Sequence, residues 1–277
     1  MTSFAPINLP VGNLLFGLSA LAAMLPATVL GLRHGQARGT VFWAVIAVAV
    51  AGPAAYAVAQ LGQGTLPSLS TALWLSVAAS LVLFLILAVV AQAARQLAPL
   101  LLPYLLVMGA VALIAGLAPA HGLAYAAPEA WLDIHVAVSL ATYGLLTLAA
   151  VAGCAVLVQE RALKRRQPTA LSRALPSVAD GETLQVRLLA ATEIVLGLGV
   201  ATGIATQYLA TGRLITFDHK TLLSLLAFVT IGALLALHHR TGLRGRRAAR
   251  IVLVAYLLLT LAYPGVKFVT DVLIGPA

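Results

Sequence analysis

The sequence predicts an all-α, polytopic membrane protein with eight transmembrane helices, and three observations lead to this fold class. Of the 277 residues, 61% are apolar and 9% are charged, whereas soluble domains are roughly 45–50% apolar and about 25% charged. The apolar residues form runs long enough to cross a bilayer as helices. The basic residues gather in alternate connections between the runs. This composition excludes a soluble enzyme, a disordered chain and a disulfide scaffold.

Each span is expected where an apolar run of about 20 residues occurs. The runs are rich in Leu and Ala and show no alternation, so transmembrane strands are not expected. Residues 160–187 form the longest polar segment, with a turn expected at Asp180-Gly181-Glu182. We expect one integral membrane domain over residues 1–277. Its eight spans are 11–32, 41–61, 69–91, 97–117, 131–157, 188–209, 221–237 and 251–274.

The distribution of basic residues predicts the orientation. The connections after spans two, four and six hold only Arg213 and Lys220 as basic residues. By the positive-inside rule, the more basic connections lie in the cytoplasm and both termini lie outside, in the periplasm of a bacterial inner membrane. The charges therefore report topology and predict no nucleic-acid partner. The basic residues after spans one, three, five and seven are Arg33, Arg38, Arg95, Arg161, Lys164, Arg165, Arg166, Arg173, Arg240, Arg244, Arg246, Arg247 and Arg250.

Histidines at the span ends are the candidate metal ligands. His219 and His238 are 19 residues apart on one span, about 28 Å along a helix, so they cannot ligate one metal. His135 and His219 lie at outer span ends, and His34 and His238 at inner ones; either pair could meet. Two imidazoles from separate helices that face one cavity are a frequently observed kind of haem b site. The sequence contains no zinc motif and no covalent haem motif.

Other polar residues within the spans have two interpretations each. Asp218 either caps span seven or recognises a polar ligand together with His219. Glu193 either pairs with Arg187 in the inner leaflet or relays protons. Tyr143 either packs between helices or lines a pocket that His135 enters. The Gly199/Gly203 pair predicts a close helix contact in span six.

Four segments together resemble the cytochrome c assembly protein family over residues 128–274. The segment Trp131-Leu132-Asp133-Ile134-His135-Val136, followed by Ser139, Tyr143 and Gly144, is similar to the family's "HV…SY" segment. Phe217-Asp218-His219-Lys220-Thr221 stands where the family has "WDPKET". Leu237-His238-His239-Arg240 and Gly242-Leu243-Arg244-Gly245-Arg246-Arg247-Ala248 resemble its "LH…GWRGRRA" block, and Tyr263-Pro264-Gly265 resembles "YFG". The first half matches only as hydrophobic spans.

The resemblance implies a haem-handling protein. By this resemblance, His135 falls on the external haem-ligand position and His238 falls on the intramembrane haem-ligand position near the inner side. Arg244 and Arg246 then flank an inner haem entrance, where guanidinium groups could meet propionates. The family's tryptophan-rich loop is missing, because residues 207–217 contain no Trp. The pattern is most similar to the short eight-span, HemX-like or YpjD-type branch. The family's second external histidine has no counterpart here, and we hypothesise that His219 replaces this outer ligand.

We therefore expect a haem-binding inner-membrane protein that handles or transports non-covalent haem b for cytochrome c biogenesis. Its partners would be lipid, haem and other cytochrome c assembly proteins, and no catalytic reaction is predicted. One alternative is a haem-free regulatory or scaffold protein that keeps the fold. A second is a small secondary transporter, although the Gly52-Pro53 interruption has no counterpart in the second half, as paired repeats would require.

Overall fold

The computed structural model describes residues 10–33, 39–61, 68–117, 129–212 and 219–265. Every regular element in these ranges is helical. The helices are α1 (Pro10–Arg33), α2 (Thr40–Leu61), α3 (Leu69–Val90), α4 (Gln92–Arg95), α5 (Ala98–Ala115), α6 (Glu129–Arg165), α7 (Ala170–Ala174), α8 (Val178–Thr211), α9 (His219–Thr241) and α10 (Gly245–Thr260), and a π-helical turn follows at Leu261–Gly265.

The chain is a multi-pass membrane protein, since seven of the described helices are long and apolar enough to cross a bilayer: α1, α2, α3, α5, α6, α8 and α9. They match the first seven predicted spans. For the eighth span, the structure describes α10, which has 16 residues, and the turn after it. Residues 266–277 and 1–9 lie outside the described ranges, so the eighth span and the periplasmic termini stay predictions.

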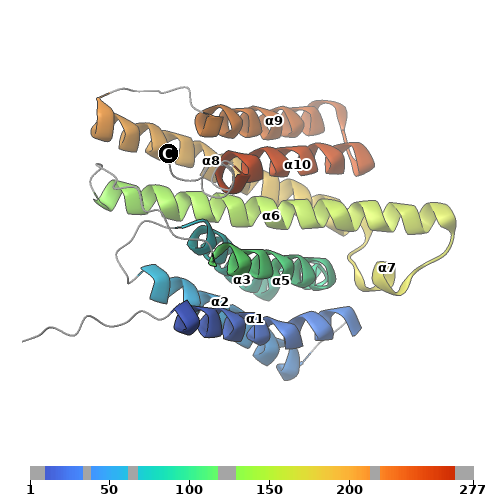
Figure 1. Cartoon of the computed structure of the whole chain (residues 1–277). Helices are drawn as coiled ribbons and strands as arrows, with labels where there is room; N and C mark the ends of the chain where they lie inside the picture. The colour runs from blue at the N-terminus through green and yellow to red at the C-terminus, as the bar shows by residue number, and fades with distance from the viewer. Residues whose placement is uncertain (1–9, 34–38, 62–67, 118–128, 213–218, 266–277) are drawn as a thin grey trace, which may run out of the picture.

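Helix α6 lies between two groups of helices. In Figure 1, α1, α2, α3 and α5 lie on one side of α6, and α8, α9 and α10 lie on the other. The most extensive contact is between α6 and α8, while α3 makes the main contact between α6 and the first group. One buried cluster contains residues of both groups, among them Met24, Leu101, Leu146 and Leu189. The two halves are therefore packed on a common core.

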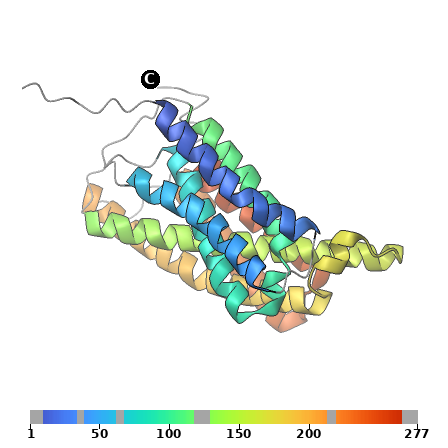
Figure 2. The ribbon, with the colours of Figure 1, turned by 90° about the horizontal axis from the view of Figure 1, so that it is seen from below.

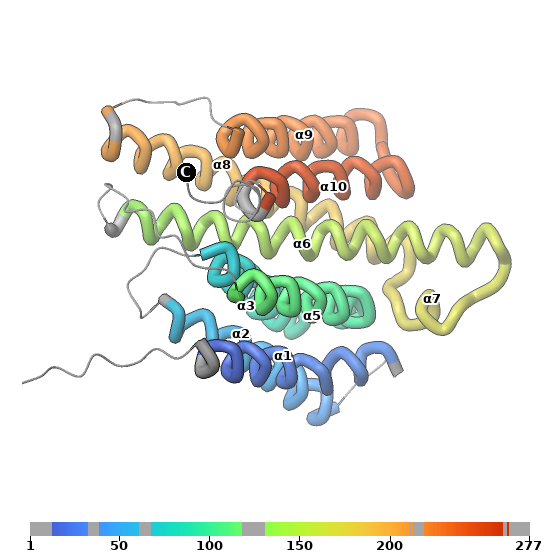
Figure 3. The backbone as a smooth tube through the Cα atoms, in the orientation of Figure 1, coloured from blue at the N-terminus to red at the C-terminus, as the bar shows by residue number. Residues whose placement is uncertain are grey.

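The end of α6 projects past the other helices. Its 37 residues extend about 55 Å, against about 30 Å for the hydrocarbon core of a bilayer. Figures 2 and 3 show this end with α7 beside it, beyond the ends of α1 and α5. The sequence predicted span five to end at residue 157, so the last two turns of the helix were missed.

The expected turn at Asp180-Gly181-Glu182 is wrong, because these residues lie in the first turns of α8. Ser177 caps the helix: its Oγ accepts the Asp180 N–H at 3.1 Å and donates to the Asp180 carboxylate at 2.7 Å. Gly181 is buried, and a Cβ there would lie 3.0 Å from Cγ2 of Val156. Glycine serves close packing against α6 at this position, and α8 starts ten residues before the predicted span.

Candidate functional site

His135 lies on α6 and faces α8. Its Nδ1 is 3.2 Å from Oγ1 of Thr202, and the Thr202 hydroxyl donates its proton to the Gly199 carbonyl at 3.1 Å. We assign the donor role in this contact to Nδ1 of His135, because the Thr202 hydroxyl proton is directed at the Gly199 carbonyl. The neutral ring therefore carries its proton on Nδ1 and has a lone pair on Nε2, which is the form that binds a metal ion.

The predicted Gly199/Gly203 face makes the room for this ring. A Cβ at Gly203 would lie 3.0 Å from Cε1 of His135, which is closer than ordinary contact. At Gly199 a Cβ would lie 3.5 Å from Val138 of α6, an ordinary van der Waals distance. The prediction of a close helix contact is confirmed. The structure adds that Gly203 is the position that accommodates the imidazole.

His238 lies near the end of α9 and is held by the chain that follows it. Its Nδ1 is 2.9 Å from the Leu243 carbonyl oxygen. A carbonyl only accepts, so Nδ1 donates and Nε2 of the neutral ring again has the lone pair. Gly242 ends α9 with φ +67°, in the left-handed region that glycine adopts without strain. This turn brings the Leu243 carbonyl back to the ring.

The two histidines lie at different depths. Glu193 of α8 meets Gly232 of α9, so His238, six residues further along α9, is level with about residue 187 of α8. Thr202, the partner of His135, is fifteen residues further along α8. At 1.5 Å per residue, the two imidazoles are about 23 Å apart along the helix axes. They therefore cannot ligate the same iron, and a ligand role for both would require two separate sites.

In the described residues, His135 contacts Thr202 and not His219. His219 is the first residue of α9 and is exposed, as is Lys220. Helices α6 and α9 pack chiefly on α8 and α10 rather than on each other. Asp218, His34 and His121 lie outside the described residues. The pairing of His34 with His238 is therefore neither supported nor contradicted.

Tyr143 belongs to a different cluster from His135. Its hydroxyl is 3.1 Å from that of Tyr256 on α10, and the Tyr256 hydroxyl is also in direct contact with that of Tyr104 on α5. Thr147 of α6 lies 3.5 Å from Tyr256. This tyrosine cluster joins the two groups of helices. Tyr256 was missed in the sequence, although a lone hydroxyl inside an apolar run was the available signal.

The basic loop before α10 is tied to α6. The backbone N–H of Arg246 donates to Oε1 of Glu160 at 3.1 Å, and Nε of Arg246 lies 3.4 Å from Oε2. Since this ion pair uses Nε, the two terminal amino groups of Arg246 stay available for an anion. Arg244 is exposed at the helix start. Both arginines of the predicted haem entrance therefore lie next to the turn that holds His238.

The expected pairing of Glu193 with Arg187 is not formed. Within the described ranges, the one ion pair found is that between Arg246 and Glu160. Arg187 is exposed, and Oε2 of Glu193 is buried without a hydrogen-bond partner. The carboxylate points instead to α9, where a Cβ at Gly232 would lie 2.8 Å from Oε1.

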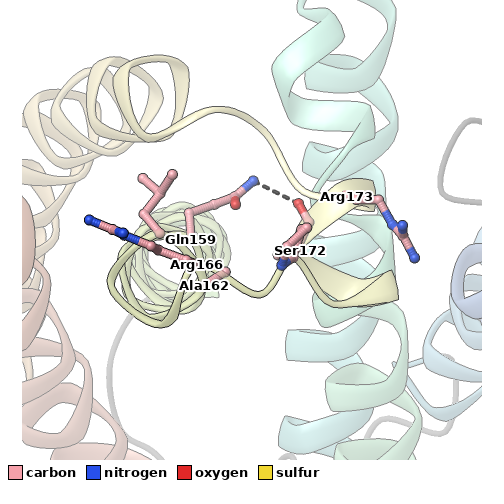
Figure 4. A pocket seen from close by; sticks show the side chains of 7 residues that line it. Gln159, Ala162, Arg166, Ser172 and Arg173 are labelled. Atoms are coloured by element: carbon pink, nitrogen blue, oxygen red, sulfur yellow. Dashed lines mark hydrogen bonds between the residues drawn. The ribbon is translucent and has the colours of Figure 1, made fainter.

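A shallow pocket lies where the end of α6 meets α7. It is lined by Gln159, Ala162, Leu163, Arg166, Pro168, Ser172 and Arg173. Nε2 of Gln159 donates to the carbonyls of Ser172 and Pro176 at 2.8 and 2.9 Å. In Figure 4 the side chains of Arg166 and Arg173 extend in opposite directions. The amide is thus used to hold the α6–α7 connection, and the two cations do not converge on one ligand.

Comparison with known proteins defines the class. The family model for the cytochrome C assembly protein matches residues 41–274, so the chain belongs to the cytochrome c assembly protein family. The match begins in α2, whereas the motifs had carried the resemblance over the second half alone. A curated relative from Azospirillum brasilense, described as an uncharacterized 28.8 kDa protein in the nifR3-like 5' region, is 52% identical over 268 residues, covering 95% of this chain and 99% of the relative.

Proposed function

We propose that this protein binds haem b non-covalently in a bacterial inner membrane and holds or transfers it for cytochrome c biogenesis. Membership of the cytochrome c assembly family supports a role in that process. The observation that carries the haem proposal is shared by His135 and His238. In both, Nδ1 donates to a protein oxygen, and the lone pair of Nε2 is left for a ligand.

The donor set fits haem iron. A neutral imidazole whose other nitrogen is hydrogen-bonded to the protein is the usual axial ligand, because that bond fixes the tautomer and the direction of the ring. Bound haem would supply the iron and any redox chemistry. The chain supplies the imidazoles and, at the inner site, the guanidinium groups of Arg244 and Arg246 for the propionates.

Two sites about 23 Å apart along the bundle suit a protein that holds haem at two depths of the membrane. His238 would receive haem near the basic end of the bundle, and His135 would hold it near the opposite end. With the basic end in the cytoplasm, as the charge distribution predicts, this order leads outward. The proposal assigns no ligand role to the exposed His219.

The test is an absorption spectrum, oxidised and reduced, of detergent-purified protein expressed with a haem precursor. We expect a Soret band with reduced α and β bands, of which H135A and H238A each remove part and the double variant removes all. H239A is the control for loss of an adjacent histidine: His239 is exposed, and its ring meets that of His238 edge-on with the centroids 5.5 Å apart. Absence of a Soret band after haem addition would overturn the proposal.

One observation favours a second candidate, a haem-free scaffold that keeps the fold. Residues 207–217, which would carry the family's tryptophan-rich loop, contain no Trp. A scaffold would bind assembly proteins without haem. The same spectrum separates the two candidates, because a scaffold gives no Soret band in the wild type or in any variant.

A further inference from the structure

The turn that holds His238 is fixed at both of its ends. At one end, the Leu243 carbonyl accepts from Nδ1 of His238. At the other, α10 begins at Gly245, two residues after Leu243. The position of the Leu243 carbonyl therefore depends on where the first turn of α10 lies, and that turn is bound to α6.

Glu160 makes this attachment. Its two carboxylate oxygens contact the same residue in two ways, with Oε1 accepting the Arg246 N–H and Oε2 meeting the Arg246 guanidinium. Arg244 at the N-cap makes no side-chain cap bond, so the carboxylate from α6 takes the place of a capping residue. A negative charge at a helix N-terminus is also favoured by the helix dipole. The Glu160 side chain is only 23% exposed, which reduces competition from water.

Gly245 allows the carboxylate to approach. A Cβ at this position would lie 2.5 Å from Oε1 of Glu160, and the residue has φ +64°. Gly242 has nearly the same conformation, with φ +67°, but nothing within 4 Å of its Cβ position. The two glycines therefore separate two effects. Alanine at either strains the backbone, while alanine at Gly245 also displaces Glu160.

We propose that Glu160 is a positioning residue for His238, acting through the start of α10 and the Leu243 carbonyl to keep the proton on Nδ1 and the lone pair on Nε2. The assignment of His238 as a haem ligand rests on the function proposed above. The geometric part, which concerns the tautomer of His238, does not depend on haem. Glu160 itself touches neither the ring nor the ligand position.

The first experiment uses the haem-free full-length protein with ¹⁵N-labelled histidine. Nitrogen chemical shifts report which ring nitrogen is protonated, and H238A identifies the His238 signals. We expect the Nδ1–H tautomer in the wild type. E160A and G245A should give a mixture with the Nε2–H tautomer. G242A strains the same turn without displacing Glu160, so the excess change in G245A over G242A measures the displacement of Glu160. E160Q, which keeps the size and one acceptor, should lie between wild type and E160A.

E182Q is the matched control for charge. The Glu182 carboxylate is 3.6 Å from the same Cβ position at Gly245 and forms no ion pair with any residue of the described ranges. The His238 tautomer signal of E182Q should therefore equal that of the wild type. Helical circular dichroism identifies any variant that fails to fold. An unchanged His238 tautomer in folded E160A and E160Q would overturn the proposal.

The second experiment titrates haem into the H135A background, so that only the inner site responds. Loss of a hydrogen-bonded partner behind a ligand commonly weakens binding about 10–100-fold, and we expect about tenfold for E160A and less for E160Q. If the tautomer shifts but no variant binds haem, the positioning role stands and the haem function fails. If haem binds through His238 with equal affinity in E160A, the positioning role fails alone.

Discussion

The two histidine sites fix their rings in the same way but on different supports. His135 donates to a side-chain hydroxyl, on Thr202, and its ring lies over Gly203, so both supports belong to one long helix. His238 donates to a main-chain carbonyl in a short turn, and that turn is held by an ion pair with a third helix. The site at His135, named the outer site after the orientation that the charge distribution predicts, therefore depends on how α6 and α8 pack. The site at His238, named the inner site on the same prediction, depends on the α9–α10 connection.

The largest effect should come from filling the space at Gly203. Val at this position would occupy the place of the His135 ring, because even a Cβ lies 3.0 Å from Cε1. We expect G203V to abolish haem binding at the outer site and to destabilise the protein by about 1–3 kcal/mol, the range typical of an overpacked contact. Haem titration in an H238A background measures the first effect and thermal unfolding the second.

G199A is the control for that experiment. Its added Cβ would meet Val138 at an ordinary 3.5 Å, so binding and stability should stay close to those of the wild type. If G203V binds haem as well as G199A does, the ring does not need the room that Gly203 leaves, and the outer site is placed elsewhere.

A smaller effect is expected at Thr202. T202V keeps the shape of the side chain but removes the acceptor for Nδ1 of His135, and a lost partner behind a metal ligand costs about tenfold or more in affinity. T202S keeps the hydroxyl and should bind like the wild type. The comparison of the two sites predicts that T202V leaves the inner site unchanged. A change at His238 in T202V would show that the two sites are coupled.

Tyr256 tests stability without touching either histidine. Its hydroxyl contacts those of Tyr104 and Tyr143, so Y256F removes the hydroxyl that these two residues share inside the bundle. We expect a loss of about 1–3 kcal/mol in the free energy of unfolding, as for other buried polar groups that lose a partner. Y143F should cost less, since it removes one contact and leaves the pair between Tyr104 and Tyr256. Equal losses in the two variants would contradict Tyr256 as the centre of the cluster.

The sequence predicted what depends on runs and spacing along one helix. Seven apolar runs correspond to seven helices, and the Gly199/Gly203 pair marked a close contact. Prediction from the sequence failed where the partner of a residue comes from another helix. Glu193 was expected to pair with the neighbouring Arg187 but faces Gly232 of α9, and Glu160 had no assigned role because Arg246 follows it by 86 positions. The start of α8 was missed because the Ser177 cap and the packing of Gly181 outweigh the local turn propensity.

The smallest effect is expected at His219, where sequence and structure lead to different expectations. From the sequence, His219 is a hypothetical substitute for a missing outer ligand. The structure places it exposed at the start of α9, while His135 faces α8. An exposed imidazole at a helix end contributes little to a site on another pair of helices. We expect H219A to change haem affinity at the outer site by less than about twofold, within the effect of an ordinary surface substitution.

K220A, with the neighbouring exposed cation removed, is the control for charge at the same end. Loss of the outer haem spectrum in H219A, but not in K220A, would mean that the start of α9 moves toward His135 when haem binds. The outer site would then depend on α9 as the inner site does, and the contrast between a helix-packed and a loop-held histidine would no longer hold.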